Sequence, residues 1–115
     1  MTRTTEPECF IYRLAPGRGE DYDRYHADVW PEVVEALRLQ GIADYRIYRR
    51  GDLVISVLTR LVDHVPSPLP EHLAVRSREW ADLMAPHFLE TTDDAGDPLF
   101  ATPVFDITET EGRNR

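Results

Sequence analysis

The sequence from residue 42 to residue 61 reads IADYRIYRRGDLVISVLTRL and has the composition of two consecutive β-strands. Both segments, Ile42 to Arg50 and Leu53 to Leu61, are rich in β-branched and aromatic residues. The Gly51-Asp52 pair between them suits a two-residue turn with glycine at its first central position. The stretch therefore predicts an antiparallel hairpin.

The second strand of this hairpin is apolar on both faces. Its alternate side chains are Leu53, Ile55 and Val57 on one face and Val54, Ser56 and Leu58 on the other. A strand that is covered by helices on one side only usually presents polar residues on its other side. The second face therefore needs a cover, which a second copy of the chain could supply by two-fold symmetry. The pattern predicts a homodimer.

The segment before the hairpin contains a strand and a long helical stretch. ECFIYRL, from Glu8 to Leu14, is strand-like and is followed by the turn-forming APGRG. Helical spacing then extends from about Glu20 to Gln40, and Gly41 supplies a C-terminal stop. Pro31 interrupts this stretch and predicts a kink, or two consecutive helices, around residues 26–30.

The segment after the hairpin begins with a loop. VDHVPSPLPE has three prolines within five residues, which excludes a regular helix or a central strand. Apolar residues at helical spacing predict a second helix from Glu71 to Pro86. After the polar run TTDDAGDP, the residues from Leu99 to Thr108 have the composition of a final strand, which Pro103 weakens.

The predicted order of strand, kinked helix, hairpin, helix and strand is the ferredoxin-like βαββαβ pattern of the α+β class. It implies an antiparallel four-stranded sheet with both helices on one face. With the predicted partner, two subunits would form a dimeric α/β barrel. At 115 residues the chain has the size of one domain, with a core over about residues 8–109 and frayed termini.

Charge and composition exclude several classes of partner. The formal net charge is −8, from 21 acidic and 13 basic residues, which opposes binding to nucleic acids and to anionic membrane surfaces. A small neutral ligand such as a sugar fits better. No stretch reaches the roughly 18 to 20 apolar residues that span a bilayer. Cys9 is the one cysteine; we interpret it as a buried structural thiol, and the cytoplasm as the compartment.

Metal and phosphate sites are not expected. The four histidines are far apart in the sequence and form no close pair with the spacing of metal ligands: His26, His64, His72 and His87. No glycine-rich run precedes a helix with a lysine, as a phosphate loop would require.

The segment DYDRYHADVWPEV, residues 21–33, contains the candidate chemistry. Tyr22 and His26 are four residues apart and share a helix face, with the imidazole beside the predicted kink. An imidazole titrates near neutral pH and can both accept and donate a proton. A structural histidine is the alternative interpretation of this residue taken alone.

Four segments together resemble the L-rhamnose mutarotase family in order and spacing. They are YHADVWPEV, GIADYRIYRRGDLVISVLTR, REWADLM and PVFDI. The most specific elements are the histidine followed by a Trp-Pro-Glu triplet and the Tyr-x-Ile-Tyr strand. The resemblance covers nearly the whole chain.

This resemblance implies a dimeric α/β-barrel enzyme that interconverts the α and β anomers of a free 6-deoxyhexose, L-rhamnose above all, without a metal or organic cofactor. The family's proton donor corresponds to His26. Its sugar-contacting tyrosines correspond to Tyr22 and Tyr45, and an aromatic pair on the second helix maps near Trp80. The family has two adjacent tryptophans there, whereas this chain has Glu79-Trp80-Ala81. The proline-rich segment 66–70 also departs from the more helical family pattern.

The hairpin tyrosines and the Trp-Pro-Glu triplet also allow structural interpretations. Tyr45 and Tyr48 are three residues apart on one strand and therefore point to opposite faces. The resemblance assigns Tyr45 to the substrate, and Tyr48 is interpreted as structural. Trp30 is interpreted as core packing, and Glu32 as a first-turn helix charge.

Two other functions remain open from the sequence. Another dimeric α/β-barrel enzyme, such as an aromatic polyketide cyclase or a cofactor-free oxygenase, would share an aromatic pocket and an acid-base histidine. A non-catalytic sugar-binding module would retain the barrel without turnover.

Overall fold

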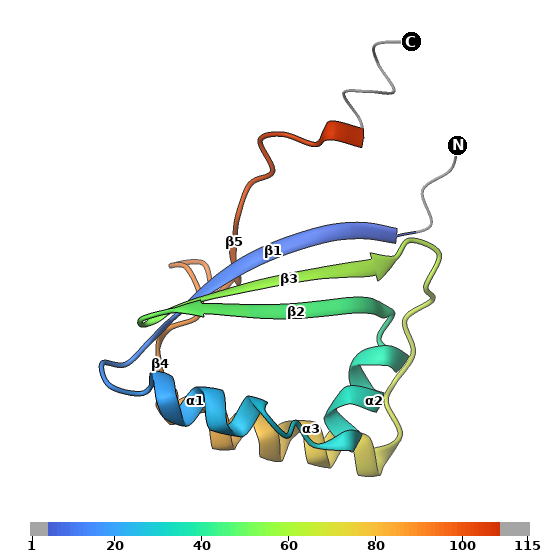
Figure 1. Cartoon of the computed structure of the whole chain (residues 1–115). Coiled ribbons are helices and arrows are strands. Elements are labelled where there is room, and N and C mark those ends of the chain that lie inside the picture. Colours follow the sequence, from blue (N-terminus) through green and yellow to red (C-terminus); the bar gives the residue numbers. More distant parts are fainter. Residues whose placement is uncertain (1–4, 109–115) are drawn as a thin grey trace.

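The protein is built from one antiparallel sheet with helices on a single face (Figure 1). The computed structural model describes residues 5–108. The elements in chain order are β1 (Thr5–Leu14), α1 (Gly19–His26), α2 (Pro31–Leu39), β2 (Ile42–Arg50), β3 (Leu53–Leu61), α3 (Glu71–Met84), the short 3-10 helix η1 (Ala85–His87), β4 (Phe88–Glu90) and β5 (Leu99–Phe100). The predicted fraying of both termini concerns residues 1–4 and 109–115, which lie outside the described residues.

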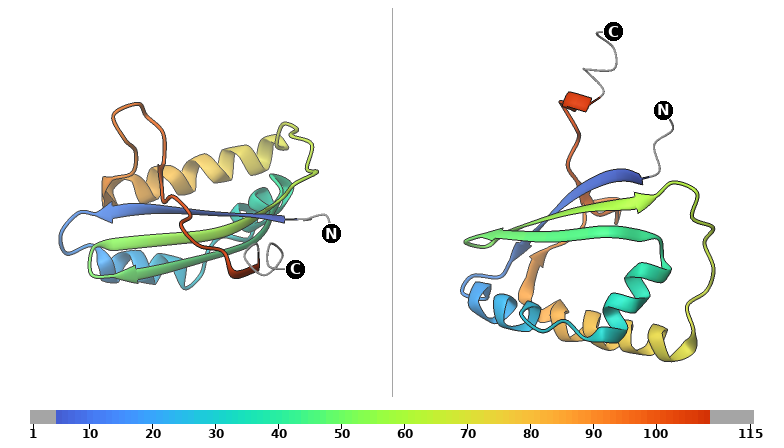
Figure 2. Two further views of the ribbon diagram at one scale, coloured as in Figure 1. Left: turned by 90° about the horizontal axis from the view of Figure 1, so that it is seen from above. Right: turned by 45° about the vertical axis from the view of Figure 1, so that its right-hand side comes forward.

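The sheet has the strand order β2-β3-β1-β4, and every pairing within it is antiparallel. This is the ferredoxin-like order, so the predicted α+β class is confirmed. The predicted four strands become five, because β5 pairs with β1 on the same edge as β4. The helices lie together beneath the sheet, as the two views in Figure 2 show.

The prediction of one final strand from residue 99 to residue 108 is wrong. Only Leu99 and Phe100 pair with β1, and the last backbone contact there is the Ala101 N–H donating to the Cys9 carbonyl at 2.7 Å. Pro103 has no N–H to donate, and the chain leaves the edge on the side of the sheet away from the helices (Figure 1). The fourth sheet position is filled instead by β4, whose three residues are too few to show a periodicity in the sequence.

Pro31 divides the predicted helical stretch into two helices, as expected. It is the first residue of α2, where its missing N–H costs no helical hydrogen bond. Trp30 before it has an extended backbone, with φ −57° and ψ 134°, as a residue that precedes proline prefers. The break leaves His26 as the last residue of α1.

The predicted hairpin and the proline-rich connection are both confirmed. Gly51 has a φ of +58° at the turn, and the register pairs Tyr48 with Ile55. Residues 64–70 form no helix or strand and connect β3 to α3. This connection packs on Gly41, whose φ is +91°, and a Cβ there would lie 2.6 Å from Cγ of His64. Only glycine therefore fits the end of α2.

The second predicted helix is confirmed, but it ends at Met84 rather than Pro86. Pro86 lies inside η1, which turns the chain from α3 into β4. The core lies between the helices and the sheet, and its fully buried side chains are Leu14, Val54, Ser56 and Leu73. No helix within residues 5–108 is long and apolar enough to cross a membrane.

The opposite face of the sheet, here called the outer face, carries mostly apolar side chains. By strand register its apolar members include Cys9, Ile11, Tyr48, Leu53, Ile55 and Val57, and Arg13, Arg46 and Arg50 lie on the same face. None of the helices within residues 5–108 covers it (Figure 1). Cys9 therefore lies partly exposed on this face, and the prediction that it is buried in a core is wrong for the isolated subunit.

Candidate functional site

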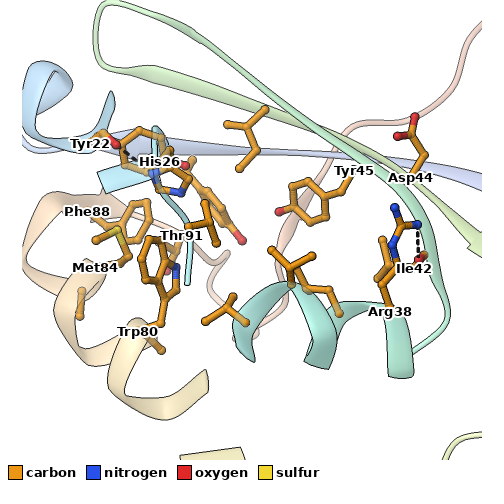
Figure 3. Close-up of a pocket in the computed structure, with 18 of the residues that line it drawn as sticks. Tyr22, His26, Arg38, Ile42, Asp44, Tyr45, Trp80, Met84, Phe88 and Thr91 are labelled. Carbon is orange, nitrogen blue, oxygen red and sulfur yellow. Dashed lines mark hydrogen bonds between the residues drawn. The ribbon is translucent and has the colours of Figure 1, made fainter. Parts of the chain in front are cut away.

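A cavity of about 820 Å³ lies between the helices and the inner face of the sheet (Figure 3). Its walls come from β1, α1, α2, β2, α3 and β4. This volume falls within the usual range for small-molecule sites, about 300 to 1,000 Å³. The fold therefore brings together side chains that are up to 79 residues apart in the sequence, from Tyr12 to Thr91.

All four site residues expected from the sequence line this cavity: Tyr22, His26, Tyr45 and Trp80. Figure 3 shows Tyr22, His26 and Trp80 grouped at one end, with Tyr45 facing them from β2. Arg38 and Asp44 lie at the opposite end. The helix break at Pro31 and the strand alternation of β2 place these side chains here.

His26 is held by its own helix. Its Nδ1 lies 2.9 Å from the carbonyl oxygen of Tyr22 one turn earlier. A carbonyl oxygen can only accept a hydrogen bond, so Nδ1 carries the proton in the neutral ring. Nε2 then has a free lone pair, and within residues 5–108 no side chain or backbone group binds it.

Two aromatic rings fix the plane of this imidazole. The Tyr22 ring stacks on it, with centroids 4.0 Å apart and an interplanar angle of 25°. The Trp80 indole meets it at 77°, with centroids 5.5 Å apart. Offset-stacked and edge-to-face pairs are the favoured aromatic geometries, so the ring has little freedom to rotate.

Burial lowers the pKa of His26 below its ordinary value of 6.5, because the charged imidazolium loses hydration. The hydrogen bond to the Tyr22 carbonyl and the Asp23 carboxylate act in the opposite direction, while nearby His87 adds to the decrease. The neutral imidazole therefore predominates at neutral pH.

Three phenols surround the cavity, and burial keeps each of them protonated. It raises the pKa of Tyr12 to about 12, and it raises the pKa values of Tyr22 and Tyr45 as well. The Ser56 hydroxyl opposes the shift at Tyr45, although no hydrogen bond of normal geometry joins the two groups. Near neutral pH these phenols can donate hydrogen bonds but cannot serve as bases.

Tyr12 is a site residue that the sequence analysis missed. It lines the cavity from β1 and packs against Phe88 of β4, with ring centroids 5.1 Å apart. Its alternation with Phe10 and Leu14 on the inner face is the signal that could have identified it.

Arg38 was also missed; its guanidinium donates to the carbonyl of Ile42 at 3.3 Å and to that of Ala43.

The two neighbours of Trp80 differ in their surroundings. Trp80 and Ala81 line the cavity, whereas the Glu79 carboxylate accepts a hydrogen bond from Arg76 at 3.1 Å. Tyr48 is on the outer face with 54% of its surface exposed, as its spacing from Tyr45 predicts.

No group of three or more potential metal-ligating side chains occurs within the described part of the chain.

An ion pair attaches α1 to β2 beside the cavity. Arg49 donates to both carboxylate oxygens of Asp23, from Nε at 2.7 Å and from Nη2 at 2.5 Å. This contact lowers the pKa of the Asp23 carboxyl. Bidentate contacts of this kind fix orientation, so the helix that carries His26 is oriented relative to the sheet.

This arrangement can exchange one proton with a bound neutral molecule. It offers an imidazole with a free Nε2, phenol donors around it and apolar ring faces as walls. General acid-base transfer by such a positioned side chain is typically worth about 10² to 10⁴ in rate. Phenol and indole rings also suit the C–H faces and hydroxyls of a sugar.

Comparison with known proteins gives a consistent result. The sequence model of the L-rhamnose mutarotase family matches residues 8–107. An L-rhamnose mutarotase of Rhizobium johnstonii is 40% identical over 87 residues, which cover 71% of this chain and 81% of the relative. One of Paraburkholderia phymatum is 42% identical over 82 residues, which cover 68% and 74%.

A solved structure shares the fold. The crystal structure of an L-rhamnose mutarotase from Formosa agariphila superposes with a TM-score of 0.64 and covers 88% of this chain and 97% of that chain. The two sequences are 21% identical, so this similarity concerns the architecture alone.

Proposed function

Because the chain belongs to the L-rhamnose mutarotase family, a family of carbohydrate isomerases, we propose that it interconverts the α and β anomers of a 6-deoxyhexose, with L-rhamnose as the first candidate. The observation that carries this proposal is the geometry of His26. Its Nδ1 is occupied by a backbone carbonyl, and its Nε2 is free beside a cavity walled by phenols and an indole.

The proposed reaction starts from the neutral imidazole. Nε2 of His26 takes the proton of the anomeric hydroxyl as the bond between the anomeric carbon and the ring oxygen breaks, which forms the aldehyde. The imidazolium then donates that proton to the released oxygen. After rotation about the bond to the aldehyde carbon, the reverse steps close the ring as the other anomer. His26 therefore acts first as a base and then as the proton donor.

The aromatic residues are proposed to bind and orient the sugar. The Trp80 indole offers an apolar face to the pyranose, and the phenol of Tyr45 faces His26 across the cavity (Figure 3). Because burial keeps the hydroxyls of Tyr22 and Tyr45 protonated, they can donate hydrogen bonds to sugar oxygens throughout the reaction. A neutral substrate also suits the acidic chain, with its formal net charge of −8.

The proposal includes a homodimer that forms through the outer face of the sheet. Residues 101–108 leave the edge of the sheet on the side of this face (Figure 1). They expose Val104, Phe105 and Ile107, at 95%, 72% and 58%. Exposed apolar side chains that lie close together are typical of a segment that packs on a partner. A second subunit would cover the outer face and receive this segment, giving the dimeric α/β barrel.

Saturation-transfer NMR with L-rhamnose and L-fucose tests the proposed activity. The protein is expected to accelerate exchange between the anomeric proton signals of at least one of these sugars beyond the buffer rate. Sugar binding without faster exchange would favour the binding module. Inertness toward both sugars, with tight binding of planar aromatic compounds, would favour the cyclase or oxygenase.

The cytoplasm remains the expected compartment.

The pH dependence of the exchange rate tests the order of proton transfer. Because burial lowers the pKa of His26, we expect activity to be retained at pH 6.5 and to fall only at more acidic pH, as the ring becomes protonated. The measurement is kcat/KM between about pH 4.5 and 8, a range that extends to both sides of the ordinary histidine pKa of about 6.5. A rate that rises on acidification through this range would show that the imidazolium, not the neutral ring, begins the reaction.

A further inference from the structure

We propose that Arg76 is a positioning residue: its guanidinium holds the Trp30 ring against Trp80, and this fixes the indole wall of the sugar site against His26. The inference rests on the proposed function and extends it to two residues, Arg76 and Trp30, which do not line the cavity. It also gives a role to the tryptophan of the Trp-Pro-Glu triplet.

The contacts form one continuous series from the surface to the imidazole. The Cζ atom of Arg76 lies 3.9 Å from the centroid of the Trp30 ring. Trp30 meets Trp80 at 74° with centroids 5.2 Å apart, and Trp80 meets His26 at 77° with centroids 5.5 Å apart. A displacement of Trp30 would therefore remove one of the two edge-to-face ring contacts of Trp80.

Two carboxylates orient the guanidinium over the indole. Nε of Arg76 lies 3.7 Å from Glu32 Oε1 in the first turn of α2, and Nη1 donates to Glu79 Oε2 at 3.1 Å. The Arg76 side chain is 35% exposed, so the stack is shielded only partly from water. A planar guanidinium held at its edges by carboxylates can stack flat on an aromatic face, whereas an ammonium has no planar group to stack.

The backbone of Trp30 is held at the start of α2, where its carbonyl accepts hydrogen bonds from the N–H groups of Val33 at 3.0 Å and Val34 at 3.2 Å. Its indole reaches α3, where it contacts Trp80 and Arg76. Arg76, Glu79 and Trp80 all belong to α3, whereas Trp30 and Glu32 belong to the start of α2. The contacts of Arg76 thus join α3 to the start of α2, a few residues after His26.

The test compares Arg76→Met with Arg78→Met. Methionine keeps the apolar stem but removes the guanidinium, and Arg78 is an exposed arginine on the same helix. Trp30 and Trp80 are the chain's two tryptophans, so their coupling can be followed by the exciton couplet in circular dichroism. We expect Arg76→Met to weaken this couplet and to lower kcat/KM for anomer exchange about 3- to 10-fold, mainly through a higher KM. Arg78→Met should match the wild type in both.

A second variant separates the stacking from the charge. Arg76→Lys keeps the positive charge for Glu32 and Glu79 but has no planar group, so it should not restore the couplet or KM. The proposal would be overturned if Arg76→Met and Arg76→Lys both had the kinetic constants and the couplet of Arg78→Met. So would a weaker couplet with unchanged kinetics. A wild-type protein that does not accelerate anomer exchange would instead refute the proposed function, while the couplet still tests the contact of Arg76 with Trp30.

Discussion

Replacing His26 with glutamine is expected to lower the rate of anomer exchange about 10²- to 10⁴-fold, to near the uncatalysed rate. Glutamine keeps a polar side chain near the Tyr22 carbonyl but cannot take up and return a proton at neutral pH. The binding walls from Tyr45 and Trp80 remain in place, so the sugar should still bind. Saturation-transfer NMR measures the rate, and ligand-observed NMR measures binding.

His72→Gln is the matched control for this variant. His72 is exposed on α3 and does not line the cavity, so its substitution should leave the exchange rate unchanged. Circular dichroism should show the same secondary structure for both variants. Activity of His26→Gln within a factor of about three of the wild type would contradict the role proposed for the imidazole, given the usual size of such effects.

The second large effect is expected for Ile55→Glu on the outer face. Ile55 is paired with Ile11 on one side and Tyr48 on the other, near the centre of the face. In a two-fold dimer each substitution occurs twice, and each removes a carboxylate from water in an apolar interface, at a cost of several kcal/mol. The dimer dissociation constant should therefore rise at least about 10³-fold. Size-exclusion chromatography with light scattering should show a dimer for the wild type and a monomer for the variant.

Leu39→Glu provides the control for this experiment. Leu39 is a 47% exposed apolar residue on α2, in the helix layer and away from the outer face, and it does not line the cavity. Its substitution adds the same charge and should leave the dimer intact. A monomeric wild type would refute the proposed homodimer. A dimeric Ile55→Glu protein would place the interface elsewhere on the molecule.

Several features could be predicted from the sequence because short-range rules govern them. The Gly51-Asp52 turn, the helix break at Pro31 and the irregular connection after β3 all follow from the backbone preferences of glycine and proline. The apolar character of both faces of β3 is likewise visible in its alternation. Motif spacing identified the family and led to the four expected cavity residues.

The last part of the sheet could not be predicted in this way. Its edge is formed by β4 and β5, which meet different parts of β1 on either side of a loop. Segments of three and two residues are too short to carry a periodic signal. Whether they pair depends on a partner strand about 80 residues earlier, so the composition of residues 99–108 suggested a longer strand than exists.

The chemistry of the site also depends on contacts between distant residues. The sequence showed which ring types were available, but the proton position on His26 follows from one hydrogen bond to the Tyr22 carbonyl. The third phenol, Tyr12, and the clamp of Arg76 on Trp30 come from elements that meet only after folding. Local patterns thus specified helices, turns and strand faces, because neighbouring residues set those preferences. The assembled cavity required packing across the whole chain, because its ring contacts and burial exist only between elements remote in sequence.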